Sequence, residues 1–309
     1  MIKRKDLLGL VDASAEEICE ILDTAANMKR LLRQGIKKLP HLEGCTATIL
    51  FYENSTRTRP SFELAANYMG ATTINIAASS SSVAKGETLI DTGKTLDAMK
   101  NDFIIIRHPM GGAPYLLART VKAGVINAGD GMNEHPTQAL LDLCTMREKF
   151  GRIEGLKVAI LGDIKHSRVA KSNLFALAKL GAEVRMYAPE TLIPKGIDRL
   201  GAKLCTSREE AVEGADVVMG LRIQLERQQA GNFPSLNEYA EFYGVNERVL
   251  SLASPDAIVM HPGPVNRGVE LTSDVIDDGK SRIEDQVLSG VAVRMAILFL
   301  LEQYRKSGK

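Results

Sequence analysis

Short apolar runs alternate with helical patterns along most of this chain, and this alternation limits the possible folds more than any other feature. Residues 46–51 form an apolar run typical of a buried strand, and residues 59–69 carry the spacing of a helix. Residues 157–163 form the clearest strand pattern. Because parallel strands need long crossovers, strands that alternate with helices predict parallel sheets covered on both faces.

The alternation continues in two series of elements. The first series opens at the capping box Ser14-x-x-Glu17, which begins a helix that ends near Leu32. It continues with strands at 72–76, 103–107 and 125–127 and helices at 87–99, 114–122 and 137–150. The second series, from 157–163 onward, has strands at 183–187, 216–219 and 257–260 and helices at 169–180 and 283–304.

The turn at residues 150–155 is the best boundary between two domains. A chain of 309 residues is long enough for two, at about 150 residues each. We therefore predict an α/β protein with two similar-sized domains, at residues 1–150 and 151–285, each a mainly parallel sheet flanked by helices. We assign the last helix, residues 286–309, to the first domain, although the pattern alone does not show where it packs.

The composition is that of an ordinary globular protein. Lys and Arg number 39 against 38 Asp and Glu, and 45% of the residues are hydrophobic. These values exclude a disordered chain and give no overall basic field for nucleic acid. The longest apolar run, residues 295–301, is far shorter than the ~18 residues of a membrane span, and no apolar segment follows the basic N-terminus. We expect a soluble, cytoplasmic protein that binds neither membrane nor nucleic acid.

Cysteine and histidine spacing predicts no metal site. The four cysteines, Cys19, Cys45, Cys144 and Cys205, include no close pair of the kind that zinc sites use, and the chain is not a short secreted one. The five histidines form no H-E-x-x-H motif. We therefore expect buried, reduced thiols.

Residues 55–59, with the sequence Ser-Thr-Arg-Thr-Arg, are a candidate phosphate site. They follow one predicted strand and open a helix, where unpaired N–H groups and a partial positive charge favour anions. Three hydroxyls and two guanidiniums add further donors, and Arg suits bidentate contact with oxyanions. The alternative is an ordinary Ser/Thr helix cap with solvated arginines. Five consecutive polar donors favour the phosphate site.

Other donors also follow predicted strands, where ligands of open α/β sheets bind. In the first half these are Arg107-His108-Pro109 and His135-Pro136-Thr137-Gln138, although a single His at a helix start is more often a cap. In the second half they are Arg168, Arg222, Gln224 and the segment 261–268. Two arginines facing a cleft would suit a dicarboxylate, and solvated loop arginines are the alternative.

These motifs, in this order, resemble the aspartate/ornithine carbamoyltransferase family. The matching segments are 55–59, Lys85-Gly86-Glu87-Thr88, 107–109, Asn127-Ala128-Gly129-Asp130-Gly131 and 135–138, and the similarity runs from about residue 5 to 305. His261-Pro262-Gly263-Pro264 is similar to the aspartate branch, whereas the ornithine branch typically has His-Cys-Leu-Pro at this place. The sequence after Pro264 resembles only a subset of that branch.

The resemblance implies a role for each matching residue. Carbamoyl phosphate would be bound by Ser55, Thr56, Arg57, Thr58, Arg107, His135 and Gln138, and by Ser81 and Lys85 from a neighbouring subunit. Among these, Arg57, Thr58, Arg107 and His135 would be catalytic, and Gln138 would contact the carbamoyl nitrogen. L-aspartate would be bound by Lys85, Arg168, Arg222 and Gln224, with the backbone of Pro262 and Gly263 at the carbamoyl group.

The implied reaction is carbamoyl transfer from carbamoyl phosphate to L-aspartate, which forms N-carbamoyl-L-aspartate in pyrimidine biosynthesis. The implied enzyme is a homotrimer with shared sites, with no metal or cofactor, and regulatory chains or another pyrimidine enzyme as further partners. Three alternatives remain. Ornithine as acceptor would call for an acidic residue, a dehydrogenase would need a G-x-G-x-x-G turn that is absent after residue 162, and a non-catalytic protein would keep the fold alone.

Overall fold

The computed structural model describes residues 2–77, 86–224 and 235–308 of the chain. The chain forms two compact units. Unit 1 comprises Met1–Cys144 and Val287–Lys309, and unit 2 comprises Thr145–Gln286. The division falls inside helix α5 (Pro136–Phe150) and close to the start of helix α11 (Ile283–Lys306). The segment from Val287 onward therefore belongs to the compact body of unit 1.

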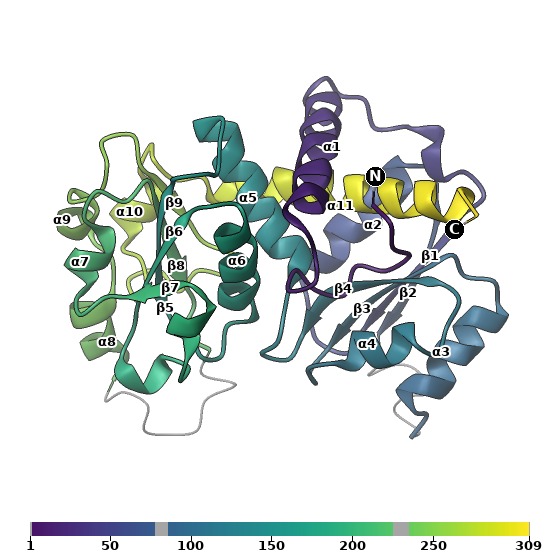
Figure 1. The fold of residues 1–309 in the computed structure, drawn as a ribbon, viewed down its shortest axis with the longest axis horizontal. Coiled ribbons are helices and arrows are strands. Elements are labelled where there is room, and N and C mark those ends of the chain that lie inside the picture. Colours follow the sequence, from purple (N-terminus) through teal and green to yellow (C-terminus); the bar gives the residue numbers. More distant parts are fainter. Residues whose placement is uncertain (1, 78–85, 225–234, 309) are drawn as a thin grey trace. The chain divides into compact units, whose positions relative to one another are not determined.

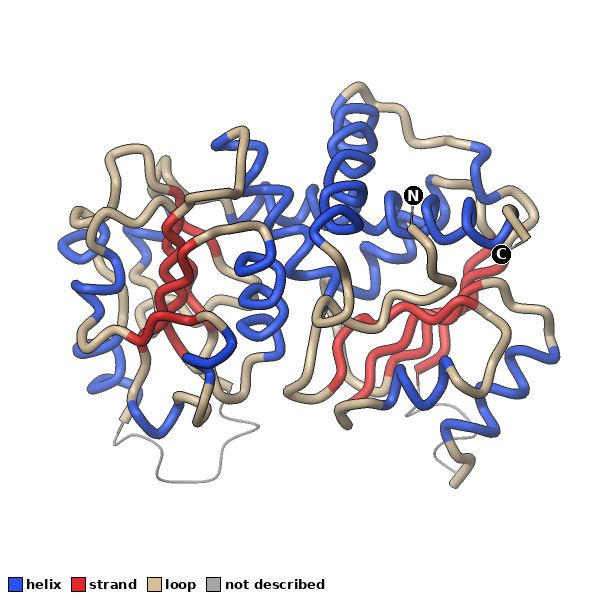
Figure 2. Tube along the Cα trace, in the orientation of Figure 1, coloured by secondary structure: helices blue, strands red, loops and turns tan. Residues whose placement is uncertain are grey.

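Unit 1 is built on a parallel sheet with the strand order β2-β1-β3-β4. Its strands are β1 (Thr46–Phe51), β2 (Thr72–Ala77), β3 (Phe103–His108) and β4 (Gly124–Asp130). Every neighbouring pair is parallel, so the carboxyl ends of all four strands lie at one edge. Figure 2 shows these strands, in red, side by side. Strands β1, β3 and β4 are almost entirely buried, as expected for a sheet covered on both faces.

Helices cover both faces of this sheet. They are α1 (Ala15–Arg33), α2 (Thr58–Tyr68), α3 (Leu89–Ala98), α4 (Ala113–Ala118), part of α5, and α11, and a short 3-10 helix η1 (Pro40–Leu42) precedes β1. Helices α3 and α4 lie on one face, and α1, α2 and α11 lie on the other (Figure 1). Leu96 and Leu117 of α3 and α4 pack with Ile104 and Ile106 of β3 in the core below the sheet.

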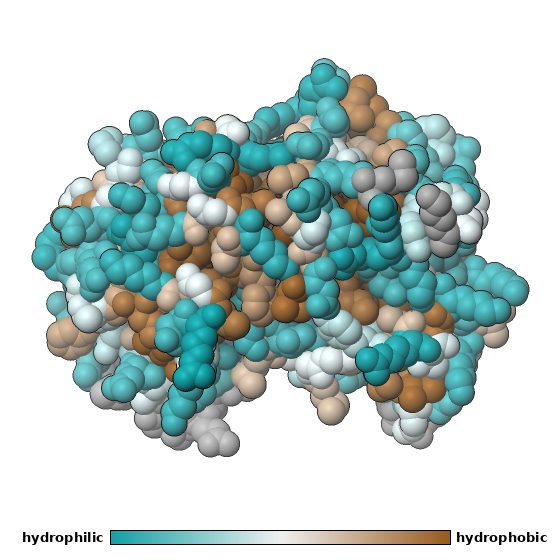
Figure 3. All heavy atoms as spheres, in the orientation of Figure 1, coloured by the Kyte–Doolittle hydropathy of each residue, from teal (hydrophilic) through white to brown (hydrophobic). Residues whose placement is uncertain are grey.

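Helix α11 is long and largely apolar. By length and composition it could cross a membrane, but 72% of its apolar window is buried inside the protein, as in the core helix of a soluble domain. Hydrophilic residues cover much of the drawn face of each unit (Figure 3).

The start of α1 carries the predicted capping box, in which Ser14 accepts from the Glu17 N–H and the Glu17 side chain accepts from the Ser14 N–H.

Unit 2 contains a second parallel sheet, with the strand order β7-β6-β5-β8-β9. Its strands are β5 (Lys157–Gly162), β6 (Glu183–Tyr187), β7 (Ala202–Leu204), β8 (Val217–Leu221) and β9 (Ile258–Met260). Its helices are α6 (Arg168–Lys179), η4 (Glu190–Leu192), η5 (Ile197–Leu200), α7 (Arg208–Val212), α8 (Leu236–Tyr243), α9 (Glu247–Leu250) and α10 (Ser273–Asp277).

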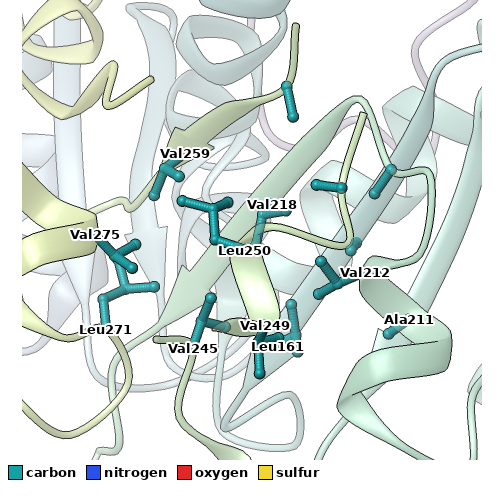
Figure 4. Close-up of a cluster of buried hydrophobic side chains, with 14 of the residues drawn as sticks. Leu161, Ala211, Val212, Val218, Val245, Val249, Leu250, Val259, Leu271 and Val275 are labelled. Carbon is teal, nitrogen blue, oxygen red and sulfur yellow. The ribbon is translucent and has the colours of Figure 1, made fainter. Parts of the chain in front are cut away.

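A core of mainly aliphatic side chains joins this sheet to helices α7, α9 and α10. Leu161, Val218 and Val259 come from three adjacent strands, and Val212 and Leu250 pack against them from the helices (Figure 4). On the other side, Leu174 and Leu177 of α6 are fully buried. The predicted fold class, two parallel sheets each flanked by helices, is confirmed.

Candidate active site

Three of the predicted donor segments meet at one edge of the unit 1 sheet. The segment 55–58 follows β1, Arg107 lies near the end of β3, and residues 135–138 follow β4. Because β1, β3 and β4 are consecutive parallel neighbours, their carboxyl ends bring these segments together. Segments separated by about eighty residues of sequence therefore contribute to one site.

The turn at residues 55–58 supplies the first group of donors. Arg57 is the residue that precedes α2, and Thr58 is the first residue of that helix. The Ser55 hydroxyl accepts from the Arg59 N–H at 3.2 Å, while Thr56 and Arg57 are exposed. The second guanidinium of the segment, Arg59, donates to the Asn75 side chain at 3.1 Å. Arg57 is thus exposed at the start of α2, whereas Arg59 links α2 to β2.

His135 and Arg107 complete this edge of the sheet. The Nε2 atom of His135 lies 3.5 Å from the Thr58 hydroxyl, and His135 is only 4% exposed. Arg107 donates from Nε to a carboxylate oxygen of Glu53 at 2.8 Å. The neighbouring His108 is part of the scaffold, because its Nδ1 accepts from the Met110 N–H and burial lowers the pKa of its ring. A hydroxyl, an imidazole and two guanidiniums thus gather around one sheet edge.

Buried acidic residues hold the loop that carries His135. The Asp130 carboxylate accepts from the Asn127 side chain at 2.9 Å and from the Glu134 N–H at 3.1 Å. Glu134 in turn accepts from the Leu10 N–H at 2.8 Å, which ties the loop to the N-terminal segment. Gly131 lies so close to the β3 loop that a Cβ atom there would come within 2.8 Å of the Pro109 carbonyl oxygen.

Gln138 lies in the first turn of α5 and is 8% exposed. Its side-chain Nε2 donates to a carboxylate oxygen of Asp142 at 2.9 Å, one helical turn further on. Asp142 is fully buried. The Gln138 amide therefore has a partner that holds one of its two ends.

The donor segments of unit 2 form a similar arrangement at the carboxyl ends of β5, β8 and β9. Arg168 is the first residue of α6 and 5% exposed, while Arg222 and Gln224 follow β8 and are half-buried. The Gln224 N–H donates to Asp163 at 3.3 Å, and Asp163 also accepts from the His166 ring at 2.8 Å. Asp163 thus links the loop after β5 to the loop after β8.

A buried histidine and glutamate shape the loop after β9. The Gly263 N–H donates to His261 Nδ1 at 2.8 Å, so the ring proton sits on Nε2, which lies 3.2 Å from Glu270. Glu270 also accepts from the Asn266 N–H at 2.8 Å. These bonds fix both ends of the segment that contains Pro262 and Gly263, which are half-buried.

Several residues that shape the site were not predicted from the sequence. They are Glu53, Asp142, Asp163 and Glu270, each of which holds a predicted site residue or its loop. Arg267 of the 261–268 segment instead forms an exposed two-bond pair with Asp277. The predicted residues Ser81 and Lys85 lie outside the described residues. In the described ranges, no group of three or more His, Cys, Asp or Glu side chains is arranged to hold a metal ion, and no disulfide joins the four cysteines.

Comparison with known proteins identifies the family. Residues 5–148 match the carbamoyl-P binding domain of the aspartate/ornithine carbamoyltransferases, and residues 154–301 match the Asp/Orn binding domain. The aspartate carbamoyltransferase catalytic subunit of Ruminiclostridium cellulolyticum is 63% identical over 97% of this chain and 96% of that protein. That of Acetivibrio thermocellus is 62% identical over 100% and 99% of the two chains.

Solved structures agree with this assignment. The aspartate transcarbamoylase of Trypanosoma cruzi, in complex with carbamoyl aspartate and phosphate, has a TM-score of 0.86 at 32% identity and covers 96% of each chain. The ornithine carbamoyltransferase of Pyrococcus furiosus has a TM-score of 0.86 at 34% identity and covers 95% of each chain. The chain therefore belongs to the aspartate/ornithine carbamoyltransferase family.

Proposed function

We propose that this protein transfers the carbamoyl group of carbamoyl phosphate to the amino group of L-aspartate, giving N-carbamoyl-L-aspartate and phosphate for de novo pyrimidine biosynthesis. Two relatives more than 60% identical over nearly the whole chain bear the name aspartate carbamoyltransferase catalytic subunit. The names of these two relatives favour aspartate over ornithine as the acceptor.

The observation that carries the proposal is the cluster of donors at the unit 1 sheet edge. The turn at 55–58 suits the phosphate group, while Thr58 and His135, 3.5 Å apart, suit a carbonyl oxygen on which negative charge develops. In the proposed reaction the neutral amine of aspartate attacks the carbonyl carbon. A tetrahedral intermediate forms, its C–O bond to the phosphate breaks, and the departing phosphate takes up the proton that the amine loses. Donors already aimed at the oxyanion lower this barrier, and holding two substrates together supplies much of the remaining acceleration.

The two substrates divide between the two halves of the chain in this proposal. Residues 1–150, with the helix 286–309, form the carbamoyl-phosphate domain, and residues 151–285 form the aspartate domain. Arg168 and Arg222 supply positive charge for two carboxylates, which need partners when they leave water. Gln224 and the backbone at Pro262 and Gly263 complete the aspartate side. The family matches at 5–148 and 154–301 support this division.

The proposed active assembly is a cytoplasmic homotrimer. In it, Ser81 and Lys85 of one subunit enter the site of its neighbour. This part of the proposal is carried by the resemblance of the 85–88 segment to the family. Assembly with regulatory chains or with another pyrimidine enzyme is compatible with it.

An acceptor assay tests the function directly. The purified protein is incubated with carbamoyl phosphate and either L-aspartate or L-ornithine, and ureido product is measured by colour. We expect product with aspartate and none above background with ornithine. Product with ornithine alone would overturn the acceptor, and no product with either would overturn carbamoyl transfer.

Arg222 provides a test of the aspartate side. Arg222→Ala should raise the KM for aspartate strongly, because one carboxylate of aspartate loses its partner. The affinity for carbamoyl phosphate should change little. Discrimination built on such polar matching can reach roughly 10⁴-fold. Succinate keeps both carboxylates but lacks the amine, so it should compete with aspartate in steady-state inhibition. Failure of succinate to compete, or an equal loss of carbamoyl phosphate affinity in the variant, would contradict the assignment.

A further inference from the structure

The Gln138 side chain has two chemically different ends, and only one of them suits the proposed ligand. The carbamoyl group carries an NH₂, which donates hydrogen bonds. An amide oxygen can accept from that NH₂, whereas an amide nitrogen facing it would place donor against donor. The role proposed for Gln138 therefore requires its Oε1, and not its Nε2, to face the substrate.

Asp142 holds the nitrogen end of this amide. The Gln138 Nε2 lies 2.9 Å from Asp142 Oδ1, and Asp142 is fully buried on the same helix. An ionised carboxylate only accepts hydrogen bonds, so it selects the donor end of a neighbouring amide. With Nε2 held by Asp142, the Oε1 atom points to the other side of the amide.

A buried guanidinium keeps a positive charge next to this carboxylate. Arg294 of α11 is 3% exposed, and its Nη2 lies 3.4 Å from the Thr137 hydroxyl. Its guanidinium packs over the Phe62 ring of α2, 4.8 Å from the ring centroid. Burial lowers the pKa of Arg294 to about 9, against the opposing effect of Asp142, so Arg294 is charged at pH 7. A positive charge at this place favours the ionised, acceptor-only form of Asp142.

We infer that Asp142 is a positioning residue that fixes the orientation of the Gln138 amide, so that Gln138 presents its oxygen to the carbamoyl NH₂ and selects carbamoyl phosphate over acyl phosphates that lack this amine. The inference rests on the function proposed above, and it adds a specificity-determining residue that does not itself touch the substrate. Gly290 leaves the space that Arg294 needs, since a Cβ atom there would come within 2.6 Å of Nη1.

The variant Asp142→Asn distinguishes a residue that orients the Gln138 amide from a residue that only fills space in the core. Asn has the same shape, but it has one amide oxygen and one amide nitrogen in place of two equivalent carboxylate oxygens. The positive charge of Arg294, which acts electrostatically on residue 142, attracts the oxygen end of that amide. The Asn nitrogen then faces Gln138. The Gln138 amide turns in response, so that its own nitrogen faces the NH₂ of the carbamoyl group.

The test compares three ligands by calorimetry: carbamoyl phosphate, acetyl phosphate, in which a methyl group replaces the NH₂, and inorganic phosphate. In Asp142→Asn we expect about 10- to 100-fold weaker binding of carbamoyl phosphate, with less than about threefold change for the other two ligands. Gln138→Ala should show the same loss of preference. Asp23→Asn, at an exposed position on α1, is the matched control and should leave all three affinities unchanged.

A charge-conserving exchange provides a second variant. In Asp142→Asn combined with Gln138→Glu, the Asn nitrogen donates to one Glu oxygen, and the other Glu oxygen accepts from the carbamoyl NH₂. The number of carboxylates is unchanged, so Arg294 keeps a nearby counter-charge. We expect the preference for carbamoyl over acetyl phosphate to return to within about tenfold of wild type. This variant also replaces Asp142→Asn if the single variant does not fold.

Each outcome decides the inference. An unchanged preference in Asp142→Asn, or equal weakening of all three ligands, would show that Asp142 only supports the fold. A folded double variant that binds phosphate without preferring carbamoyl phosphate would also overturn the inference. If the inference fails but the wild-type protein forms carbamoyl-aspartate, the proposed function still stands. If the wild-type protein forms no carbamoyl-aspartate, both the inference and the proposed function are overturned.

Discussion

Arg57 is the residue whose charge the proposed chemistry needs most. It is exposed at the start of α2, and its neighbour Arg59 is bonded to Asn75. Arg57→Ala should lower kcat by about 10²–10³-fold while the protein stays folded, because an interaction that strengthens in the transition state is lost. Steady-state kinetics and circular dichroism measure the two effects. Arg30→Ala, an exposed arginine on α1, is the control, and near-normal kcat in Arg57→Ala would remove the phosphate assignment.

At the residue scale, the polar segments that follow the strands are predictable from the sequence, whereas most residues that bond to them are not. The donors at 55–58 and 135–138 stand out because polar residues cluster directly after apolar strands. The Gln138–Asp142 pair has a signal in the sequence, since Gln and Asp four residues apart bond along a helix. Arg294 carried none. It reaches Thr137 from 157 positions away, and only the folded chain brings the two residues together.

Loops between elements set the geometry of the site. Gly131, in the loop after β4, packs closely against the loop after β3. Its φ is +51°, and a Cβ atom would lie 2.8 Å from backbone atoms of both Pro109 and Gly111. Gly131→Ala should therefore push apart the loops after β3 and β4 and move His135. We expect a loss of about 1–3 kcal/mol in unfolding free energy and a marked fall in kcat. Chemical denaturation and kinetics measure these effects.

Gly35 offers a matched control for that substitution. It also has a positive φ, +77°, but nothing lies within 4 Å of a Cβ atom there. Gly35→Ala should cost only the backbone strain, about 1 kcal/mol, and leave kcat unchanged. Equal effects of the two substitutions on stability and kcat would contradict the close approach of the two loops.

The contact between Cys45, which directly precedes β1, and the end of α11 predicts that stability depends on pH. Cys45 is 3% exposed, and burial together with the negative charges of Glu302 and Asp102 raises the pKa of its thiol to about 11. The Arg305 guanidinium lies beside it, with Nη2 3.6 Å from the sulfur. The thiol of an unfolded chain ionises near a pKa of about 8.5. Above that value the unfolded state binds fewer protons than the folded state, so stability falls as pH rises to about 11.

Cys45→Ala removes this titrating group. Denaturation curves between pH 8 and 11 should therefore show a steeper loss of stability in the wild type than in the variant. The difference should vanish below about pH 8, where the thiol is protonated in both states. Parallel curves for the two proteins across the whole range would refute the raised pKa.

At the element scale, mostly buried strands are predictable from the sequence, whereas the mostly exposed strand β7 is not. The strands at 46–51 and 183–187 were predicted with their observed bounds. Strand β7 was missed because it has three residues, two of them exposed, at the edge of the sheet. The helix predicted at 114–122 ends at Ala118, and Lys5 then donates to the carbonyls of Ala118, Val121 and Ala123. Such a distant cap leaves no pattern near the helix itself.

At the scale of the whole chain, both units follow one plan. In each, a parallel sheet is covered by helices, and the polar segments follow three adjacent strands: β1, β3 and β4 in unit 1, and β5, β8 and β9 in unit 2. Strand order was not predictable from the sequence, because it depends on which crossovers pass each face. The common direction of the strands was predictable, and it is sufficient to collect the donors of each unit at one edge.

The proposed trimer gives the last prediction, in which two inactive variants restore activity to one another. Arg57→Ala and Lys85→Ala homotrimers should each be nearly inactive. If Lys85 acts in a neighbour's site, a site is intact when an Arg57-containing chain receives Lys85 from the adjacent chain. Random 1:1 mixing of the two variants in a cyclic trimer makes about a quarter of the sites intact. Dissociation and reassociation of the mixture should therefore recover about a quarter of wild-type activity.

A second mixture controls for effects of reassociation itself. Arg57→Ala and His135→Ala alter groups at the same sheet edge of the same chain, so no mixed trimer of these two contains an intact site. That mixture should stay inactive, while native mass spectrometry verifies that the subunits have mixed. Recovery in the Arg57/Lys85 mixture alone would then require a site shared between chains. Absence of recovery in a proven mixture would mean that Lys85 serves its own chain or no site at all, because every other condition for complementation would have been met.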